Sequence, residues 1–202
     1  MALVQTASEL IRKFEGYISK PMWDVNAYRL GYGSDTIELP NGTHRKVLKT
    51  DVTTKQYAEK DLQRRLNTEF IPRVKNQIGE PYWSNLPIPA QASLISLAYN
   101  YGSVTKKEII NAARSGDVNA LSKAIVDSTY NDNAKLPEKQ KDALRGRRKK
   151  EADFAKSILN KISEGIKGAE QKAEDNPLIT ITGIVVVGIA LAVLYITIKN
   201  KK

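Results

Sequence analysis

Two carboxylates frame a segment that could do hydrolytic chemistry. Glu15 and Asp24 stand nine residues apart in the stretch KFEGYISKPMWDVNAYRLGYGSDT, residues 13–36. Hydrolysis of a glycosidic bond needs one carboxylic acid to protonate the leaving oxygen and a carboxylate across the sugar that activates water or attacks directly. The acid requires an apolar pocket, whereas its partner must stay ionised in a wetter place. By spacing alone, both residues could also be solvated surface charges.

A helix followed by a hairpin would hold such a pair. Apolar residues recur at the 3/4 spacing of one helix face over residues 5–15, and Gly16 ends the pattern, so Glu15 lies at the helix edge. Three strand-like segments follow, AYRLGYG, TIELP and THRKVLK, and Asn41-Gly42 between the last two predicts a tight turn. We expect one antiparallel sheet of two or three strands. Asp24 should lie at the open end of its hairpin and face Glu15 across a cleft.

The remainder of the globular part has helical patterns. Thr53 and Gln56 have the spacing of a capping box at the start of a helix whose apolar stripe extends to Pro72. Residues 90–102 are apolar on nearly all sides and predict a central buried helix, whereas residues 81–89 are expected to form a loop.

The last part of the globular region should hold three further helices. Gly116-Asp117 separates two shorter ones, and a final helix over residues 141–162 should turn Leu144, Phe154, Ile158 and Ile162 inward. The predicted fold class is therefore α+β: mostly helical, with a small antiparallel sheet near the N-terminus.

Composition restricts the chemistry and the partners. The chain has no cysteine and a single histidine, His44, which excludes disulfides and the usual zinc ligand sets, so neither a cofactor nor a metal is expected. The net charge of +10 suggests an anionic partner: nucleic acid, phospholipid headgroups or an acidic wall polymer. The basic run RGRRKK, residues 145–150, is interpreted as a solvated helix face or as a surface that attracts wall or lipid anions. Nucleic acid is therefore not expected as a partner.

The C-terminal part reads as a membrane anchor. Residues 178–198 carry no charge, and as a helix they would be roughly 31 Å long, close to the hydrocarbon thickness of a bilayer. Tyr195 near the end and three following lysines are typical of a membrane boundary; the alternative is a buried core helix. The expected organisation is a catalytic domain (1–160), a polar linker (161–177), a single transmembrane helix (178–198) and a basic tail (199–202).

Four segments together resemble a known family. The pattern FEGY…WD…GYG is similar to the N-terminal signature of phage-type lysozymes, glycoside hydrolase family 24. The segments VTTKQYAEKDL, PAQASLISLAYNYGSV and LRGRRKKEADFAKS resemble the family's helix after the sheet, its central helix and its closing motif. The resemblance covers about residues 9–157, in the family's order and spacing, and implies a lysozyme-like fold.

The resemblance also implies roles for individual residues. Glu15 would be the general acid, Asp24 the second carboxylate, and Asn100 a residue that touches sugar. Arg147, Arg148 and Glu151 match the closing motif and are interpreted as mainly structural, with Arg148 and Glu151 able to pair on one helix face.

The chain departs from the family near the Gly-Tyr-Gly. Arg29 replaces the threonine that helps to hold the attacking water, Ser34 replaces a histidine, and the spacing from Asp24 is one residue shorter. Ser34, Asp35 or Thr36 could hold the attacking water in place of the threonine. Arg29 could pair with Asp24 or with substrate carboxylates. Tyr32 in the same segment completes the substrate-binding candidates, while Trp23, Trp83 and Tyr82 could either stack on sugars or pack under loops.

The resulting expectation is a membrane-anchored lysozyme of a bacteriophage or prophage. It would cleave peptidoglycan strands between N-acetylmuramic acid and N-acetylglucosamine, from the internal membrane of a virion or from the host inner membrane. A lytic transglycosylase on the same fold, or an inactive wall-binding membrane protein, are the alternatives. The oligomeric state is left open.

Overall fold

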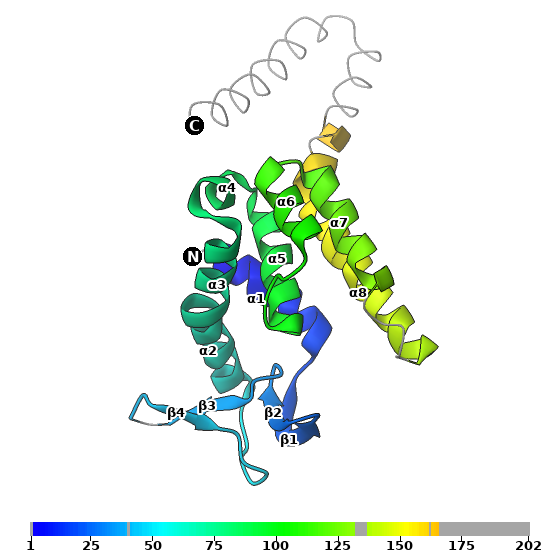
Figure 1. The fold of residues 1–202 in the computed structure, drawn as a ribbon. Coiled ribbons are helices and arrows are strands. Elements are labelled where there is room, and N and C mark those ends of the chain that lie inside the picture. The colour runs from blue at the N-terminus through cyan, green and yellow to red at the C-terminus, as the bar shows by residue number, and fades with distance from the viewer. Residues whose placement is uncertain (1, 40, 132–136, 162, 166–202) are drawn as a thin grey trace, which may run out of the picture.

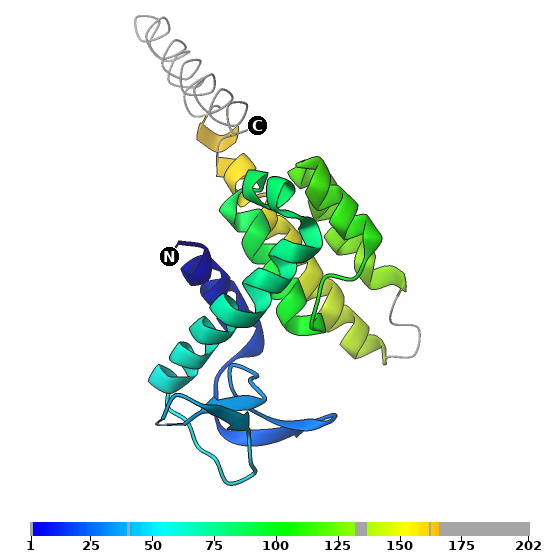
Figure 2. The ribbon, with the colours of Figure 1, turned by 60° about the vertical axis from the view of Figure 1, so that its left-hand side comes forward.

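Strands and helices occupy different ends of the molecule. The computed structural model describes residues 2–39, 41–131, 137–161 and 163–165. The strands lie together at one end, and α2 runs from them into the helices (Figures 1 and 2). The elements are α1 (Ala2–Glu15), β1 (Ile18–Asp24), β2 (Ala27–Gly31), β3 (Thr36–Glu38), β4 (His44–Lys46), α2 (Lys55–Arg65), a π-helical turn (Leu66–Phe70), α3 (Ile71–Ile78), α4 (Glu80–Asn85), α5 (Ile88–Tyr101), α6 (Lys107–Ser115), α7 (Val118–Asn131) and α8 (Glu138–Ala155).

Helix α5 forms the centre of the core. Every residue from Ala90 to Ala98 is buried, and the helix packs against α1 and α8. Pro89 occupies the first turn, where its missing N–H costs no helix bond, and Gly102 ends the helix in the left-handed region at φ +84°. The predicted central helix is therefore confirmed, because a helix that is apolar all round can only be stable when it is covered on all sides.

Helix α8 buries charge as well as apolar side chains: Phe154 packs against the core as predicted, and Ala152 and Ala155 are buried. Arg148 and Glu151 are both fully buried and form an ion pair with each other, as their spacing suggested. The Ser96 hydroxyl of α5 donates to Glu151 at 2.7 Å, so this pair also joins the two helices. The predicted inward position of Ile158 is wrong, since this side chain is exposed beyond the end of α8, and Ile162 lies outside the described residues.

The strands form two small sheets instead of one. Antiparallel β1 and β2 make the first sheet and antiparallel β3 and β4 the second, with a single bridge from Leu30 to Ser34 between them. The Asn41-Gly42 turn is confirmed: Gly42 has φ +79°, and the Asn41 side chain accepts the Thr43 N–H at 3.0 Å. Strand β1 was not predicted; it places Asp24 opposite Ala27, at the tip of the first hairpin.

Three further details differ from the sequence expectation. Thr54, not Thr53, caps α2 by accepting the Tyr57 N–H at 3.3 Å. Helical structure continues past Pro72, because the wider turn over Leu66–Phe70 accommodates a residue that has no N–H to donate. The prediction of a loop over residues 81–89 is wrong over most of its length: α4 extends to Asn85 with Trp83 buried in it, and α5 begins at Ile88.

The membrane prediction falls on the part of the chain that the structure leaves undescribed. Residues 178–198 lie outside the described residues. Among the residues that are described, no helix is both long enough and apolar enough to cross a bilayer.

The first sheet contacts α2 at Gly31, and this contact yields a test. Gly31 has φ +64°, and a Cβ there would lie 2.9 Å from the Ala58 Cβ of α2. Gly31→Ala should therefore lower the free energy of unfolding by about 2–4 kcal/mol, from backbone strain plus overpacking. Gly42→Ala is the matched control, because Gly42 has φ +79° with nothing near its Cβ position, so only strain of about 1–2 kcal/mol applies. Urea unfolding followed by circular dichroism measures both, and equal losses would show that the contact with Ala58 is unimportant.

Candidate active site

Glu15 lies where the helices meet the strands. It is the last residue of α1, and Gly16 ends the helix at φ +66° by directing the chain into β1. The side chain of Glu15 is 21% exposed. Gly33, at φ +84°, faces it: a Cβ on this glycine would lie 3.5 Å from Glu15 Oε2. The predicted position at the helix edge is confirmed, and the carboxyl group is partly withdrawn from solvent.

The immediate neighbour of Glu15 is a cation. Arg147 of α8 places Nη2 2.8 Å from Glu15 Oε1, while its Nε lies 3.2 Å from the buried Glu151. The guanidinium also lies 4.8 Å from the ring centre of Phe14. The sequence suggested an apolar pocket, and Arg147 was interpreted as mainly structural. In the structure, this arginine joins the closing motif directly to the candidate acid.

Tyr99 of α5 contacts the segment that faces Glu15, and Asn100 follows it in the same helix. The Tyr99 hydroxyl donates to the Tyr32 carbonyl at 2.7 Å. Burial raises the pKa of this hydroxyl well above its usual value; the charge of Arg65 opposes the shift and the charge of Glu15 adds to it. Tyr99 therefore lies within the electrostatic reach of both residues. Asn100 is exposed, and its Oδ1 accepts a hydrogen bond from Arg148, so its NH₂ group is the end that remains for a ligand.

Asp24 lies at the tip of the first hairpin, whereas Glu15 lies at the C-terminal end of α1. Its side chain is 61% exposed, and its ion-pair partner is Arg29, with Nε 3.5 Å from Oδ2. This is the pairing that the sequence allowed for Arg29. Glu15 and Asp24 thus contact different arginines, and the role of Asp24 as second carboxylate stays a prediction.

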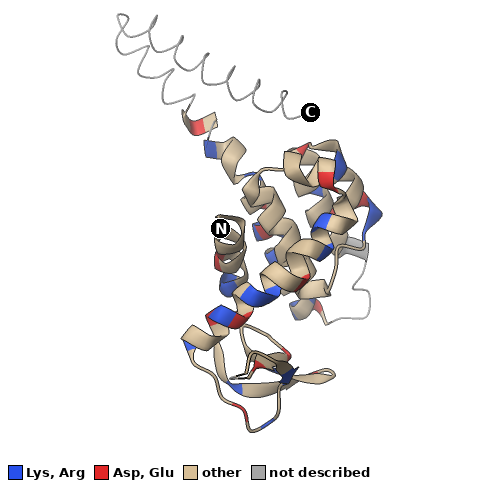
Figure 3. Cartoon of the chain, turned by 90° about the vertical axis from the view of Figure 1, so that its left-hand side faces the viewer, with Lys and Arg blue, Asp and Glu red and all other residues tan. Residues whose placement is uncertain are grey.

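Asp35 is held by three cations. It pairs with Lys46 of β4, with Arg29 of β2 at 3.8 Å and with Arg65 of α2 at 3.9 Å. Burial raises the pKa of Asp35, but the hydrogen bond from Lys46 and the charges of Lys46, Arg65 and Arg29 outweigh it and leave the pKa below its usual value. Basic and acidic positions alternate along α2, which supplies one of these cations (Figure 3).

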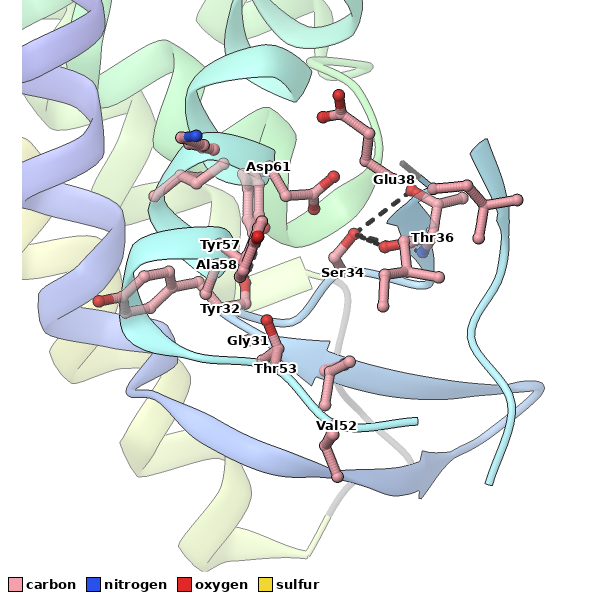
Figure 4. Close-up of a pocket in the computed structure, with 16 residues that line it drawn as sticks. Gly31, Tyr32, Ser34, Thr36, Glu38, Val52, Thr53, Tyr57, Ala58 and Asp61 are labelled. Carbon is pink, nitrogen blue, oxygen red and sulfur yellow. Dashed lines mark hydrogen bonds between the residues drawn. The ribbon is translucent and has the colours of Figure 1, made fainter. Parts of the chain in front are cut away.

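Ser34 and Thr36 line a pocket against α2. The Ser34 hydroxyl donates to the Thr36 carbonyl at 2.8 Å, and Arg64 donates to Thr36 Oγ1 at 3.3 Å. Figure 4 shows both side chains facing the pocket, near Asp61 and Tyr57. The pocket has a volume of about 540 Å³ and is lined by Leu30, Gly31, Tyr32, Ser34, Thr36, Ile37, Glu38, Leu39, Val52, Thr53, Tyr57, Ala58, Lys60, Asp61, Leu62 and Tyr99. The hydroxyls of Ser34 and Thr36 already have protein partners, so their proposed hold on a water molecule stays a prediction.

The tryptophans differ in exposure. Trp83 is buried in the helical core, which matches local packing. Trp23 is 62% exposed beside Asp24, with the Tyr28 ring against it at 5.1 Å in an edge-on arrangement. Trp23 therefore offers apolar ring surface on the hairpin tip.

Several residues of the site carried no clear sequence signal. Lys46, Arg65 and Tyr99 were not singled out, because their contacts join segments that are distant in the chain. For Arg147 a signal existed: it stands four residues before Glu151, the spacing of an ion pair along one helix face.

The electrostatic environment of Asp35 predicts a pH-dependent stability. Its folded-state pKa is lowered, so its charge stabilises the fold above the unfolded pKa of about 3.9, and this contribution is lost as the pH falls through the lower folded value. Asp35→Asn should thus reduce the free energy of unfolding by about 1–3 kcal/mol at pH 7, with a smaller difference near pH 3. Urea titrations at both pH values measure this. Asp24→Asn, at an exposed position, is the matched control and should cost less; an equal cost would contradict the assignment.

The comparison with known families agrees with this arrangement. The phage lysozyme family model matches residues 12–151, more than half of the chain. No curated protein is similar enough to this chain to count as a match. The matched span begins within α1 and ends at Glu151. It therefore includes Glu15, both hairpins, α5, and Arg147 and Arg148 of α8. This chain therefore belongs to the phage lysozyme family of peptidoglycan-degrading enzymes.

Proposed function

We propose that this protein is a muramidase that hydrolyses the β-1,4 bond between N-acetylmuramic acid and N-acetylglucosamine, with Glu15 as the proton donor. The observation that carries the proposal is the position of Glu15 within the family-matched span. It is a partly buried carboxyl group at the end of α1, facing Gly33 and held by Arg147.

Glu15 would act in its protonated form. It would pass its proton to the glycosidic oxygen as the bond to the sugar C1 breaks, which removes the need to expel an alkoxide. The ion pair with Arg147 represents the ionised form that Glu15 has after this transfer. Since Arg147 is also anchored on Glu151, it can keep the carboxylate oriented until a proton returns.

A lytic transglycosylase is the second candidate, and the observation that favours it is Arg29. This residue stands where the family has a water-holding threonine, and it pairs with Asp24. If no group positions water, the sugar's own 6-hydroxyl can close an anhydro ring, a reaction that needs chiefly one acid/base carboxyl group. The products distinguish the two reactions.

Replacing the proton donor tests the proposal. Glu15→Gln keeps the side-chain shape but cannot deliver a proton, so the rate of glycan cleavage should fall by roughly 10²–10⁴-fold. Glu9→Gln is the control, because Glu9 lies exposed on the same helix and should leave the rate unchanged. Clearing of peptidoglycan-containing gels gives the rate. Mass spectrometry of the products should show new reducing ends. If Glu15→Gln still clears the gel, Glu15 is not the proton donor. If the products carry anhydro-muramic ends, the reaction is transglycosylation and not hydrolysis.

We also propose that residues 178–198 anchor the enzyme in a lipid bilayer, either the internal membrane of a virion or the inner membrane of the host. The support is the sequence itself: a stretch of 21 uncharged residues that is followed by Lys199, Lys201 and Lys202. An anchored enzyme would act on the wall during penetration or at lysis, close to the membrane that holds it.

The anchor is testable with a double substitution. Val186→Lys together with Leu191→Lys places two charges near the centre of the stretch, each costing about 2.5–3.5 kcal/mol on insertion. The unmodified chain should sediment with membranes, resist washing with high salt and dissolve only in detergent, whereas the double variant should stay in the supernatant. If salt alone releases the unmodified chain, the attachment is electrostatic and the anchor proposal fails. Lys123→Gln, at an exposed position of α7, is the control and should sediment with membranes like the unmodified chain.

A further inference from the structure

A fully buried arginine contacts the last turn of α5. Arg148 of α8 donates to Glu151 and also to Oδ1 of Asn100. Its guanidinium lies 4.5 Å from the ring centre of Tyr101, the residue after Asn100. Glu151 pairs with Arg147 as well, so one carboxylate serves two arginines. Asn100 is an exposed residue, and its contact with Arg148 therefore connects a buried cation to the surface of the protein.

The chemistry of Arg148 dictates which end of the Asn100 amide faces it. A guanidinium carries only N–H donors, so the atom of Asn100 that it binds must be the carbonyl oxygen. A rotation of the amide by half a turn would press the NH₂ group against a buried cation, and a hydrogen bond that water cannot replace would be lost. The two N–H donors of Asn100 are therefore held at the opposite end of the amide. Within the described part of the chain, no acceptor bonds to them.

The same buried carboxylate connects Asn100 to the proposed proton donor. Glu151 binds Arg148, which holds Asn100. Glu151 also binds Arg147 at 3.2 Å, and this arginine holds Glu15 at 2.8 Å. The donors of Asn100 and the carboxyl group of Glu15 thus share one buried support, so a glycan that binds to the first is positioned relative to the second.

We propose that Arg148 is a positioning residue: it holds Asn100 so that the two N–H groups donate to the carbonyl oxygen of an N-acetyl group on the glycan. The inference rests on the proposed function, which makes the glycan the ligand. Both sugars of the strand carry an N-acetyl group, and its carbonyl oxygen can only accept a hydrogen bond. A sugar hydroxyl can donate or accept, so it would bind either end of an amide and would not require the amide to be held.

Replacing the donors of Asn100 by an acceptor tests the proposal. Asn100→Asp keeps an oxygen atom for Arg148 but has no N–H group to offer the substrate. The KM for glycan cleavage should rise by roughly 10–100-fold with kcat little changed, because a hydrogen bond becomes a contact between two acceptors. Asn111→Asp, at an exposed position of α6, introduces the same charge and should leave KM unchanged. The release of soluble fragments at increasing peptidoglycan concentration gives both constants.

Removal of acetyl groups from the glycan tests the ligand. Chemical de-N-acetylation to increasing degrees replaces the carbonyl oxygen by an ammonium group, which only donates. The rate of the unmodified protein should fall steeply with the degree of de-N-acetylation. The rate of Asn100→Asp should fall less, because its carboxylate accepts a hydrogen bond from the ammonium group. An equal decline for both proteins would overturn the assignment of the N-acetyl group as the ligand.

A double-mutant cycle tests the role of Arg148. The ammonium group of Arg148→Lys is a single point of charge, so it cannot bind Glu151 and Asn100 through separate nitrogen atoms as the guanidinium does. KM should therefore rise by roughly three- to tenfold in this variant. In an Asn100→Asp background the same substitution should change KM little, because the donors are already absent. Equal increases in both backgrounds would show that Arg148 acts through the fold and not through Asn100.

Failure of this inference differs from failure of the proposed function. If the unmodified protein cleaves glycan and Asn100→Asp does so with the same KM, the inference is overturned while the enzymatic function stands. If the unmodified protein cleaves no glycan, the proposed function fails and this inference fails with it. Where Arg148→Lys does not fold, urea unfolding of Asn100→Asp decides. A carboxylate that Arg148 holds should keep the protein at least as stable as the unmodified chain, and a loss of stability would overturn the contact.

Discussion

The buried carboxylate of Glu151 is the constraint on which the rest of this structure depends. A negative charge without access to water is strongly unfavourable unless cations and hydrogen-bond donors surround it. Arg148, Arg147 and the Ser96 hydroxyl supply them, which fixes α8 against α5. The same contacts orient both arginines, so that Arg148 holds Asn100 and Arg147 holds Glu15. A single buried charge thus determines how the helical core meets the end of α1.

Glu15 and Asp35 are both partly buried, and they differ in the number of cations that pair with them. Glu15 has one cationic partner and lies beside Gly33, which cannot contribute a side chain. Asp35 has three cationic partners drawn from β2, β4 and α2. For Asp35, these cations outweigh the effect of burial and hold the pKa of its carboxyl group below the usual value. Gly31 brings the first sheet close to α2, and Arg65 of that helix in turn reaches Asp35.

Local signals predicted most of the helices and one of the hairpins. Apolar periodicity predicted α1, and an all-round apolar segment predicted α5. The Gly116-Asp117 break predicted the division between α6 and α7, and Asn41-Gly42 predicted the turn between β3 and β4. Strand β1 was missed because it contains Pro21 and an irregular stretch between Ile18 and Met22, so it shows no clean alternation. The burial of Arg148 and Glu151 in α8 was missed for another reason: hydropathy patterns cannot detect a charge that becomes favourable inside the protein only with its partner.

The sequence by itself determined that Glu15 stands at the end of a helix, because the apolar stripe and Gly16 are local features of the chain. It also determined the α+β class, and its motifs indicated the family. Only the tertiary structure decided which charges surround each carboxyl group. Arg147 is distant from Glu15 in the chain, and the three cations around Asp35 come from three elements. Electrostatic environments depend on distances of a few ångströms across the folded molecule, and the spacing of residues along the chain does not specify these distances.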